Sequence, residues 1–109
     1  MNKPNKASVP YDETLIEDLR NDEAAQIAYI QASLEENRAF PKAILVAIRH
    51  VAEARGFKSF AQETKLNRET LYKTLSEDGN PTFESLLKML DVLGLDFDVK
   101  PKVSKLNAG

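Results

Sequence analysis

The stretch SFAQETKLNRETLYKTLS, residues 59–76, predicts two short helices joined by a tight corner. Ser59 and Gln62 have the spacing of a capping box at the start of the first helix. Asn67 is suited to cap the second helix, because its side chain can accept a hydrogen bond from the first helical turn. Leu66 lies between the two helices and is expected to fill the corner.

The outward face of the second predicted helix carries polar and charged side chains. Leu71 and Leu75 are four residues apart and face inward. At about 100° per residue, an arc of about 140° on the other side holds Arg68, Glu69, Tyr72, Lys73 and Ser76. A helix of this kind fits the major groove of DNA, and the order of elements is that of a helix-turn-helix. The alternative is a plain helical hairpin within a small bundle.

The corner departs from the usual motif. Glycine is common there because the backbone is left-handed, whereas this chain has Lys65, at a cost of about 1 kcal/mol. Lys58, Ser59 and the amide end of the first helix are suited to phosphate contact, which positions a protein on DNA without reading its sequence. We assign Gln62, on the same helix, to this phosphate-contacting set.

Charge is unevenly distributed along the 109 residues, although the net charge is only −2. Residues 1–37 hold three basic and eight acidic side chains, residues 38–76 hold eight and three, and residues 77–109 hold four and six. The net charges are therefore −5, +5 and −2. The positive block coincides with the two predicted helices and the helix before them, and a DNA-binding surface needs such local positive charge.

The composition favours neither an enzyme nor a membrane protein. The chain has no cysteine and one histidine, His50, so a metal site or a histidine-based catalytic pair has little support, and we expect His50 on a helix surface. No carboxylate pair in an apolar pocket and no glycine-rich phosphate loop is indicated. No apolar run could span a membrane, and the N-terminus does not resemble a signal peptide. We predict no catalytic residues, metal or cofactor, and a cytoplasmic location.

The pattern of the whole chain predicts an all-α fold with one short strand. Five segments are expected: a flexible arm (1–10), an acidic helical extension (11–37), a helix-turn-helix domain (38–94), a dimerising strand (95–101) and a tail (102–109). Within them, helices are predicted at 11–20, after a cap at Asp22, from Phe40 to Arg55, and from Thr82 to Gly94. The acidic extension suits docking of a basic partner protein, or else is a solvated outer layer.

The segment after the last helix alternates apolar and acidic residues. Leu95, Phe97 and Val99 would share one face of a strand. Because a lone strand leaves its backbone hydrogen bonds unmade, we expect it to pair with its copy in a homodimer. The alternative is an extended tail that packs its apolar residues on the core.

Several segments resemble a known family. YDETLIEDLRNDEAAQIAYIQASLEE, the residues from Phe60 to Leu75, and LSEDGNPTFESLLKMLDVLGL are similar to addiction-module antidote proteins, the antitoxins of HigA-like toxin–antitoxin pairs. These have a helix-turn-helix of the phage-repressor type. The resemblance runs from Tyr11 to about Leu95 and is most specific at residues 75–82.

This resemblance implies a cytoplasmic bacterial antitoxin that represses its own operon by binding double-stranded DNA. It further implies a small basic toxin as partner, typically a messenger-RNA-cleaving ribonuclease of the RelE type. Base reading falls to Asn67, Arg68, Glu69, Tyr72 and Lys73, of which Arg68 is best suited to grip guanine with two hydrogen bonds. Two alternatives stay open: a phage-type regulator without a toxin, and an interaction module whose helix-turn-helix no longer reads DNA.

Overall fold

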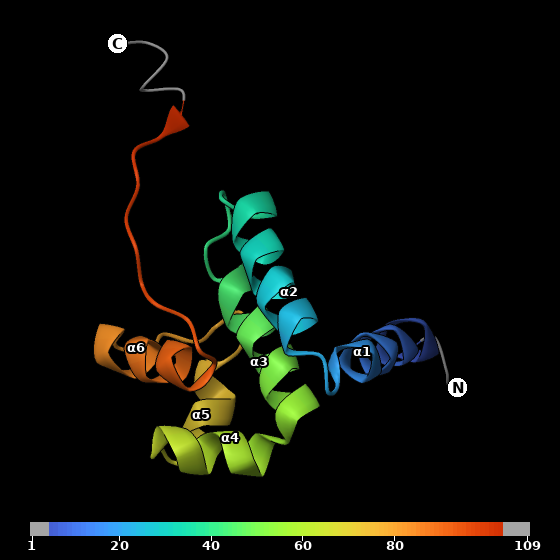
Figure 1. Cartoon of the computed structure of the whole chain (residues 1–109). Coiled ribbons are helices and arrows are strands. Elements are labelled where there is room, and N and C mark those ends of the chain that lie inside the picture. The colour runs from blue at the N-terminus through green and yellow to red at the C-terminus, as the bar shows by residue number, and fades with distance from the viewer. Residues whose placement is uncertain (1–4, 104–109) are drawn as a thin grey trace.

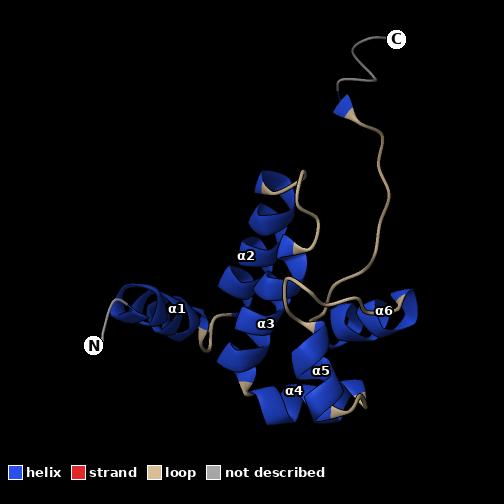
Figure 2. Cartoon of the chain, turned by 180° about the vertical axis from the view of Figure 1, so that it is seen from behind, coloured by secondary structure: helices blue, strands red, loops and turns tan. Residues whose placement is uncertain are grey.

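Six helices follow one another in the computed structural model, which describes residues 5–103 of the chain (Figure 1). They are α1 (Asn5–Leu19), α2 (Glu23–Glu36), α3 (Ala43–Arg55), α4 (Phe57–Thr64), α5 (Arg68–Thr74) and α6 (Phe83–Val92). The described residues form no strand, and Figure 2 shows only helices and loops. The predicted all-α architecture is confirmed in this range.

Helix α3 is the centre of the fold. It contacts α1, α2 and α4, and its buried side chains include Ile48, Val51 and Ala52. It begins at Ala43, two residues after Pro41, whereas the sequence predicted a start at Phe40 and Pro41. Phe40 is 73% exposed because the chain is still in a turn there, and the Ala43 amide bonds back to the Phe40 carbonyl (2.9 Å).

Helix α1 begins earlier than predicted. The sequence suggested a flexible arm over residues 1–10, but the described backbone is helical from Asn5; residues 1–4 lie outside the described range. Two prolines and the lack of an apolar period gave no helix signal there. The helix predicted at 11–20 is present within α1, where Leu19 is buried and Leu15 and Ile16 pack against the core.

The start of α2 agrees with the sequence. The Asp22 side chain accepts a hydrogen bond from the Ala25 amide (3.0 Å), as predicted for a cap. Ile30 is buried, and Tyr29 packs against the core. Gln26 joins α2 to α1, because its Nε2 donates to the Leu19 carbonyl at the end of α1 (2.7 Å).

Arg55, at the end of α3, connects three helices. Its guanidinium donates to Gln26 Oε1 on α2 (2.8 Å) and to the Val92 carbonyl at the end of α6 (3.2 Å). The Glu23 carboxylate of α2 lies 3.6 Å from the same guanidinium. The positive charge of Arg55 thus lies at the C-terminal end of α6. The free carbonyl groups there carry partial negative charge and stabilise a cation.

The prediction of a surface position for His50 is wrong. The side chain is only 6% exposed, since it lies on the side of α3 that α1 and α2 cover. Its Nδ1 and the Tyr29 hydroxyl form a hydrogen bond of 2.7 Å, while Nε2 has no hydrogen bond and lies 3.9 Å from an Asp12 carboxylate oxygen. Burial lowers the pKa of His50 below 6.5, although the Asp12 carboxylate acts in the opposite direction.

Helix α6 packs against α4, and it has a capped start and a glycine end. Thr82 accepts a hydrogen bond from the Ser85 amide (3.0 Å), and Gly94 ends the helix with a φ of 79°, both as predicted. Its core contribution comes from Met89, Leu90 and Leu93. The apolar side chains of Phe83 and Leu87 are 57% and 37% exposed, because they lie on the side of α6 that faces away from the bundle.

The predicted strand at 95–101 is not formed within the single chain. After Leu95, whose amide bonds to the Leu90 carbonyl (2.8 Å), the chain runs away from α6 as an extended arm with no regular structure through Lys102 (Figure 1). The reason is physical: a strand requires a neighbour, and the described part of one chain supplies none. Phe97 and Val99 are 54% and 80% exposed. The tail from residue 104 lies outside the described residues.

Candidate nucleic-acid interface

The corner between α4 and α5 is left-handed at Lys65. This residue has φ 62° and ψ 26°, and its amide donates to the carbonyls of Ala61 (3.0 Å) and Gln62 (3.2 Å). The Thr64 hydroxyl donates to the Ala61 carbonyl (2.9 Å) and accepts from the Leu66 amide (3.2 Å). These bonds satisfy the end of α4 and turn the chain, so that a lysine holds the conformation usually left to glycine.

Asn67 caps α5, as predicted. Its Oδ1 accepts a hydrogen bond from the Thr70 amide (3.0 Å). Leu71 and Leu75 are 1% and 0% exposed, which anchors the inner face of α5 in the core. The same cap limits Asn67 as a base reader, because its oxygen is already engaged and only its amide NH₂ group can still donate to DNA.

The outer face of α5 presents Arg68, Glu69 and Lys73, all of them exposed. Within the described range, no carboxylate forms an ion pair with Arg68 or Lys73. Their charges are therefore available to an external partner. Glu69 lies on the same face and would repel phosphate while accepting hydrogen bonds from the amino group of cytosine.

Tyr72 is directed toward the protein more than expected. Its ring stacks on Phe57 at the start of α4, with centroids 4.1 Å apart and planes inclined by 32°. Its hydroxyl donates to Glu53 Oε2 on α3 (3.2 Å). Partial burial and the Glu53 carboxylate raise the pKa of Tyr72 above 10.0, so the phenol stays a neutral donor. The side chain is still 43% exposed and can reach a ligand with one edge.

The expected phosphate-contacting residues lie on α4. Lys58, Ser59 and Gln62 are all exposed. The predicted Ser59 cap is wrong, since α4 begins at Phe57 and Gly56 precedes it with a φ of 101°, a conformation that favours glycine. The buried Phe57 ring explains the earlier start, because it continues the apolar face of α4. The free amides of this end are therefore those around residues 57–59.

Acidic residues of α1 lie beside this surface. A groove of about 530 Å³ is lined by Glu13, Ile16, Glu17 and Arg20 of α1 and by Glu53, Phe57 and Tyr72. The acidic residues of α1 thus lie next to the Tyr72 side chain in this groove. Among the residues described, they form no ion pair with Arg68 or Lys73. Charge counting along the sequence separated the acidic and basic blocks, but it could not show that they meet at this groove.

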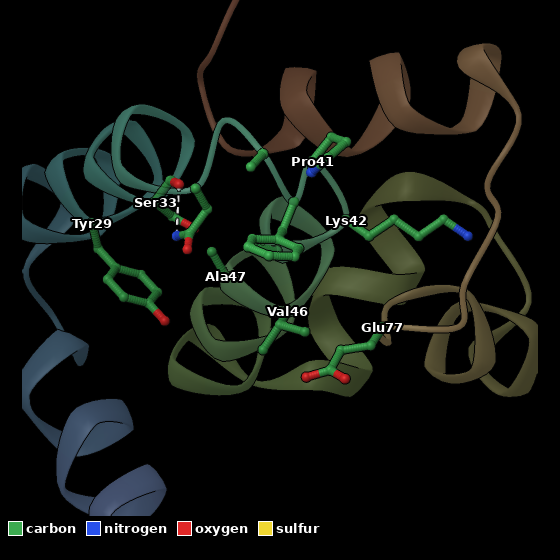
Figure 3. Close-up of a pocket in the computed structure, with 11 residues that line it drawn as sticks. Tyr29, Ser33, Pro41, Lys42, Val46, Ala47 and Glu77 are labelled. Carbon is green, nitrogen blue, oxygen red and sulfur yellow. Dashed lines mark hydrogen bonds between the residues drawn. The ribbon is translucent and has the colours of Figure 1, made fainter.

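A second, larger groove lies away from the reading face. It measures about 660 Å³ and is formed by the end of α2, the following turn and the start of α3, as Figure 3 shows for Tyr29, Ser33, Pro41, Lys42 and Val46. Glu77, after α5, closes one side. None of the predicted DNA-contacting residues lines it. Sequence reasoning did not identify this groove, because its walls come from ordinary helix ends.

No helix in the described range is both long and apolar enough to cross a membrane. Those residues also contain no group of three potential metal ligands. The site is thus best characterised by the exposed side chains of α4 and α5.

The chain is similar to a known protein family and to a protein of another organism. A family model described as "Probable addiction module antidote protein" matches residues 11–101. An "Uncharacterized protein" of Haemophilus influenzae (strain ATCC 51907 / DSM 11121 / KW20 / Rd) is 36% identical over 89 residues, which cover 82% of this chain and 89% of the relative. No solved structure gives a significant match. The family match includes α2 to α6 and hence every residue of the candidate interface.

Proposed function

The chain belongs to the family of probable addiction module antidote proteins, and we propose that it is a DNA-binding antitoxin. In this proposal a homodimer binds its own promoter through a helix-turn-helix formed by α4 and α5 and represses its operon. Family membership implies a cognate toxin; we further propose a ribonuclease of the RelE type, which the antitoxin neutralises by binding rather than by catalysis. A cytoplasmic location belongs to the same proposal.

One observation carries the DNA-binding part. The left-handed corner at Lys65 supports an outer face of α5 on which Arg68 and Lys73 are exposed and, among the described residues, unpaired with any carboxylate. Arginine can donate two parallel hydrogen bonds to guanine in the major groove, and lysine can contact either guanine or phosphate. Lys58, Ser59 and Gln62 on α4 are suited to the adjacent phosphates.

The other proposed readers take smaller roles. Asn67 retains its amide NH₂ group as a donor, and Glu69 is an acceptor for cytosine. Tyr72 can contact a base or sugar with its exposed edge while its hydroxyl remains bonded to Glu53. We therefore expect Arg68 to contribute most of the discrimination between bases.

A second candidate function is a protein-interaction module that no longer reads DNA. The observations that favour it are the engaged side chains of Asn67 and Tyr72 and the carboxylate of Glu69 on the reading face. Under this alternative the protein would bind its promoter no better than unrelated DNA. A phage-type regulator without a toxin would bind the promoter but would not rescue toxin-expressing cells, so the rescue assay below distinguishes it from an antitoxin.

The test compares the wild type with R68A/K73A in two assays: binding to the promoter fragment, and rescue of cells that express the cognate toxin. We expect promoter affinity to fall at least about tenfold, because base and phosphate contacts are lost together. Toxin rescue should be retained. K88A, which removes one exposed lysine from α6, is the control and should change neither result.

Each other outcome has a clear meaning. Unchanged promoter binding by R68A/K73A would show that the reading residues are wrongly assigned. Wild-type binding that does not distinguish the promoter from random DNA would support the interaction module instead. Failure of the wild type to rescue any toxin-expressing cell would remove the antitoxin part of the proposal.

A further inference from the structure

The arm after α6 has an unusual sequence, LDFDVKPKV, residues 95–103. It is fixed to α6 at its start, where the Leu95 amide bonds to the Leu90 carbonyl and the Phe97 ring meets Phe83 edge-on with centroids 5.2 Å apart. Beyond this point the described structure gives residues 96–102 no backbone–backbone hydrogen bond. The Val99 amide donates to Asp98 Oδ1 (2.8 Å), and the other peptide groups of residues 96–102 are available to another chain.

The charges of the arm are arranged symmetrically about Val99. Asp96 and Asp98 precede it, and Lys100 and Lys102 follow at the same distances. If two copies run antiparallel with Val99 opposite Val99, each aspartate faces a lysine: Asp98 opposite Lys100 and Asp96 opposite Lys102. Opposite charges that face one another across two strands are stabilising, and like charges are destabilising. The arm is therefore complementary to itself in this register.

We propose that the arms of two copies of this chain pair as an antiparallel two-stranded ribbon whose two-fold axis passes through Val99. This inference rests on the proposed homodimer and specifies its interface by residue. A two-fold interface requires a surface that matches itself, and the acid–acid–base–base order supplies that match. The arm is an exposed segment whose peptide groups, apart from the Val99 amide bonded to Asp98, can be satisfied by a second strand.

Pro101 provides an independent check of the register. Residues opposite one another in an antiparallel pair alternate between positions that exchange backbone hydrogen bonds and positions that do not. If Val99 occupies a non-bonded position, Phe97 opposite Pro101 does too, and the missing N–H of proline is not needed. The bonded positions are then Asp98 with Lys100 and Asp96 with Lys102, all of which have an N–H.

The same register separates apolar from charged side chains. Phe97, Val99 and Pro101 lie on one face of the ribbon, and the aspartates and lysines lie on the other. In the single chain Phe97 is already against Phe83, and Leu87, Leu90 and Phe97 line one shallow groove along α6. The apolar face of the ribbon would therefore cover the exposed side of α6 in both copies, including Phe83 and Leu87.

The test uses two charge-reversed forms of the full chain. D96K/D98K makes all four charges of the arm positive, and K100D/K102D makes all four negative. Each should place like charges opposite one another and weaken self-association at least about tenfold. An equimolar mixture restores every opposite pair in the proposed register, so it should form a one-to-one heterodimer about as tightly as the wild type dimerises. Analytical ultracentrifugation measures the masses, and differently tagged copies identify the heterodimer.

A control distinguishes the arm from general charge effects. E13K/D18K changes the net charge of α1 by the same amount as D96K/D98K and should leave the dimer unchanged. Circular dichroism checks that each variant retains its helix content. A wild-type monomer at about 100 μM, or a charge-reversed arm that dimerises like the wild type, would overturn the inference. So would a mixture that fails to form the heterodimer.

The result is separable from that of the proposed function. If dimerisation responds to the charge reversals as expected but the dimer does not bind the promoter, the proposed DNA reading is contradicted and the proposed ribbon is supported. A dimer that binds the promoter and ignores the charge reversals would contradict only the ribbon. The two failures therefore have different signatures in the ultracentrifuge and in the binding assay.

Discussion

The orientation of α5, and with it the candidate interface, depends on Lys65, whose backbone is left-handed. Its φ of 62° is costly for any side chain with a Cβ atom, yet the corner is held by two bonds from its amide and by the Thr64 hydroxyl. The strain of the left-handed backbone at Lys65 lowers stability locally, but this conformation makes the turn that leads into α5. The exposed lysine side chain adds positive charge beside the proposed phosphate-contacting residues.

K65G should stabilise the protein by about 0.5–1 kcal/mol, because glycine adopts this conformation without strain. The midpoint of urea unfolding measures the change. K65A is the matched control: it removes the charge but retains Cβ, so it should not reproduce the gain. Equal stabilisation by both variants would show that the charge, and not the backbone conformation, is what costs stability.

His50 should make stability depend on pH. Its pKa is below the unfolded value of 6.5 because burial disfavours the charged ring. As the pH falls, His50 therefore binds a proton in the unfolded chain at a higher pH than in the folded chain. The contribution of His50 is fully present above that value and is lost as the pH falls through the lowered pKa. The melting temperatures of wild type and H50Q at about pH 7.5 and about pH 5.5 test this.

We expect H50Q to show a smaller loss of melting temperature on acidification than the wild type. The Tyr29 hydroxyl and the Asp12 carboxylate, which approach His50 from α2 and α1, remain in both proteins. A wild type that becomes more stable than H50Q as the pH falls would show that attraction to Asp12 outweighs burial.

Residue positions were predictable where local spacing decides them. The caps at Asp22, Asn67 and Thr82 and the buried Leu71 and Leu75 follow from short patterns, since a cap or an inward face depends on neighbours a few residues away. His50 and Tyr72 were placed wrongly or incompletely because their surroundings come from distant helices. No local pattern shows that α1 and α2 cover one side of α3, or that Phe57 lies under the Tyr72 ring.

At the scale of elements, the connection between α5 and α6 is fixed by a close approach of backbone. Gly79 is buried, and its amide bonds to the Ser76 carbonyl (2.9 Å). A Cβ atom built there would lie 1.6 Å from the Thr74 carbonyl oxygen. This glycine is required by space rather than by an unusual φ, in contrast to Gly94, where φ is 79° and the nearest atom, Glu23 Oε2, is 3.9 Å away.

G79A should therefore destabilise the protein by about 2–3 kcal/mol or more, since backbone must move to admit the methyl group. G94A should cost only about 1 kcal/mol, the usual difference for a left-handed position. Chemical denaturation of both variants gives the comparison. A G79A protein as stable as the wild type would mean that the turn can open without loss.

Helix boundaries were less predictable than helices. The start of α4 at Phe57 and of α1 at Asn5 differ from expectation, because Gly56 rather than Ser59 precedes α4 and the start of α1 has no apolar period. The predicted strand is absent from the single chain for a different reason: residues 95–101 alternate as strand residues do, but a strand needs a neighbour, and the described part of one chain supplies none. The large groove near Phe40 had no signal, since its walls come from separate helix ends.

In the whole molecule, the acidic residues of α1 and the exposed basic residues of α5, the proposed DNA-reading surface, belong to one fold. The acidic residues of α1 border the groove below Tyr72, while Arg68 and Lys73 remain exposed on α5. A net charge of −2 is thus compatible with DNA binding, because phosphate responds to local rather than total charge. The proposed toxin, being basic, would be attracted to the acidic layer.

Because the proposed DNA contacts come from the exposed basic residues of α4 and α5, we predict that promoter binding weakens steeply as salt rises. Neutralising exposed carboxylates of α1, which border the groove below Tyr72, should strengthen promoter binding only slightly. E13Q/E17Q removes two carboxylates of α1, and fluorescence anisotropy with a labelled promoter fragment measures its affinity. We expect a gain of less than about threefold at about 0.15 M salt, since both carboxylates are exposed to solvent and salt screens their repulsion of phosphate. A larger gain in affinity would show that α1 restrains DNA binding.

A double-mutant cycle can establish whether Arg68 binds a guanine in the major groove, as we propose. The cycle combines R68A with promoter fragments in which one guanine at a time carries 7-deazaguanine, which lacks the N7 acceptor. At the contacted guanine, the base change should weaken wild-type binding about tenfold and leave R68A binding unchanged. If every deaza substitution weakens wild type and R68A by the same factor, Arg68 does not read guanine and the account is wrong.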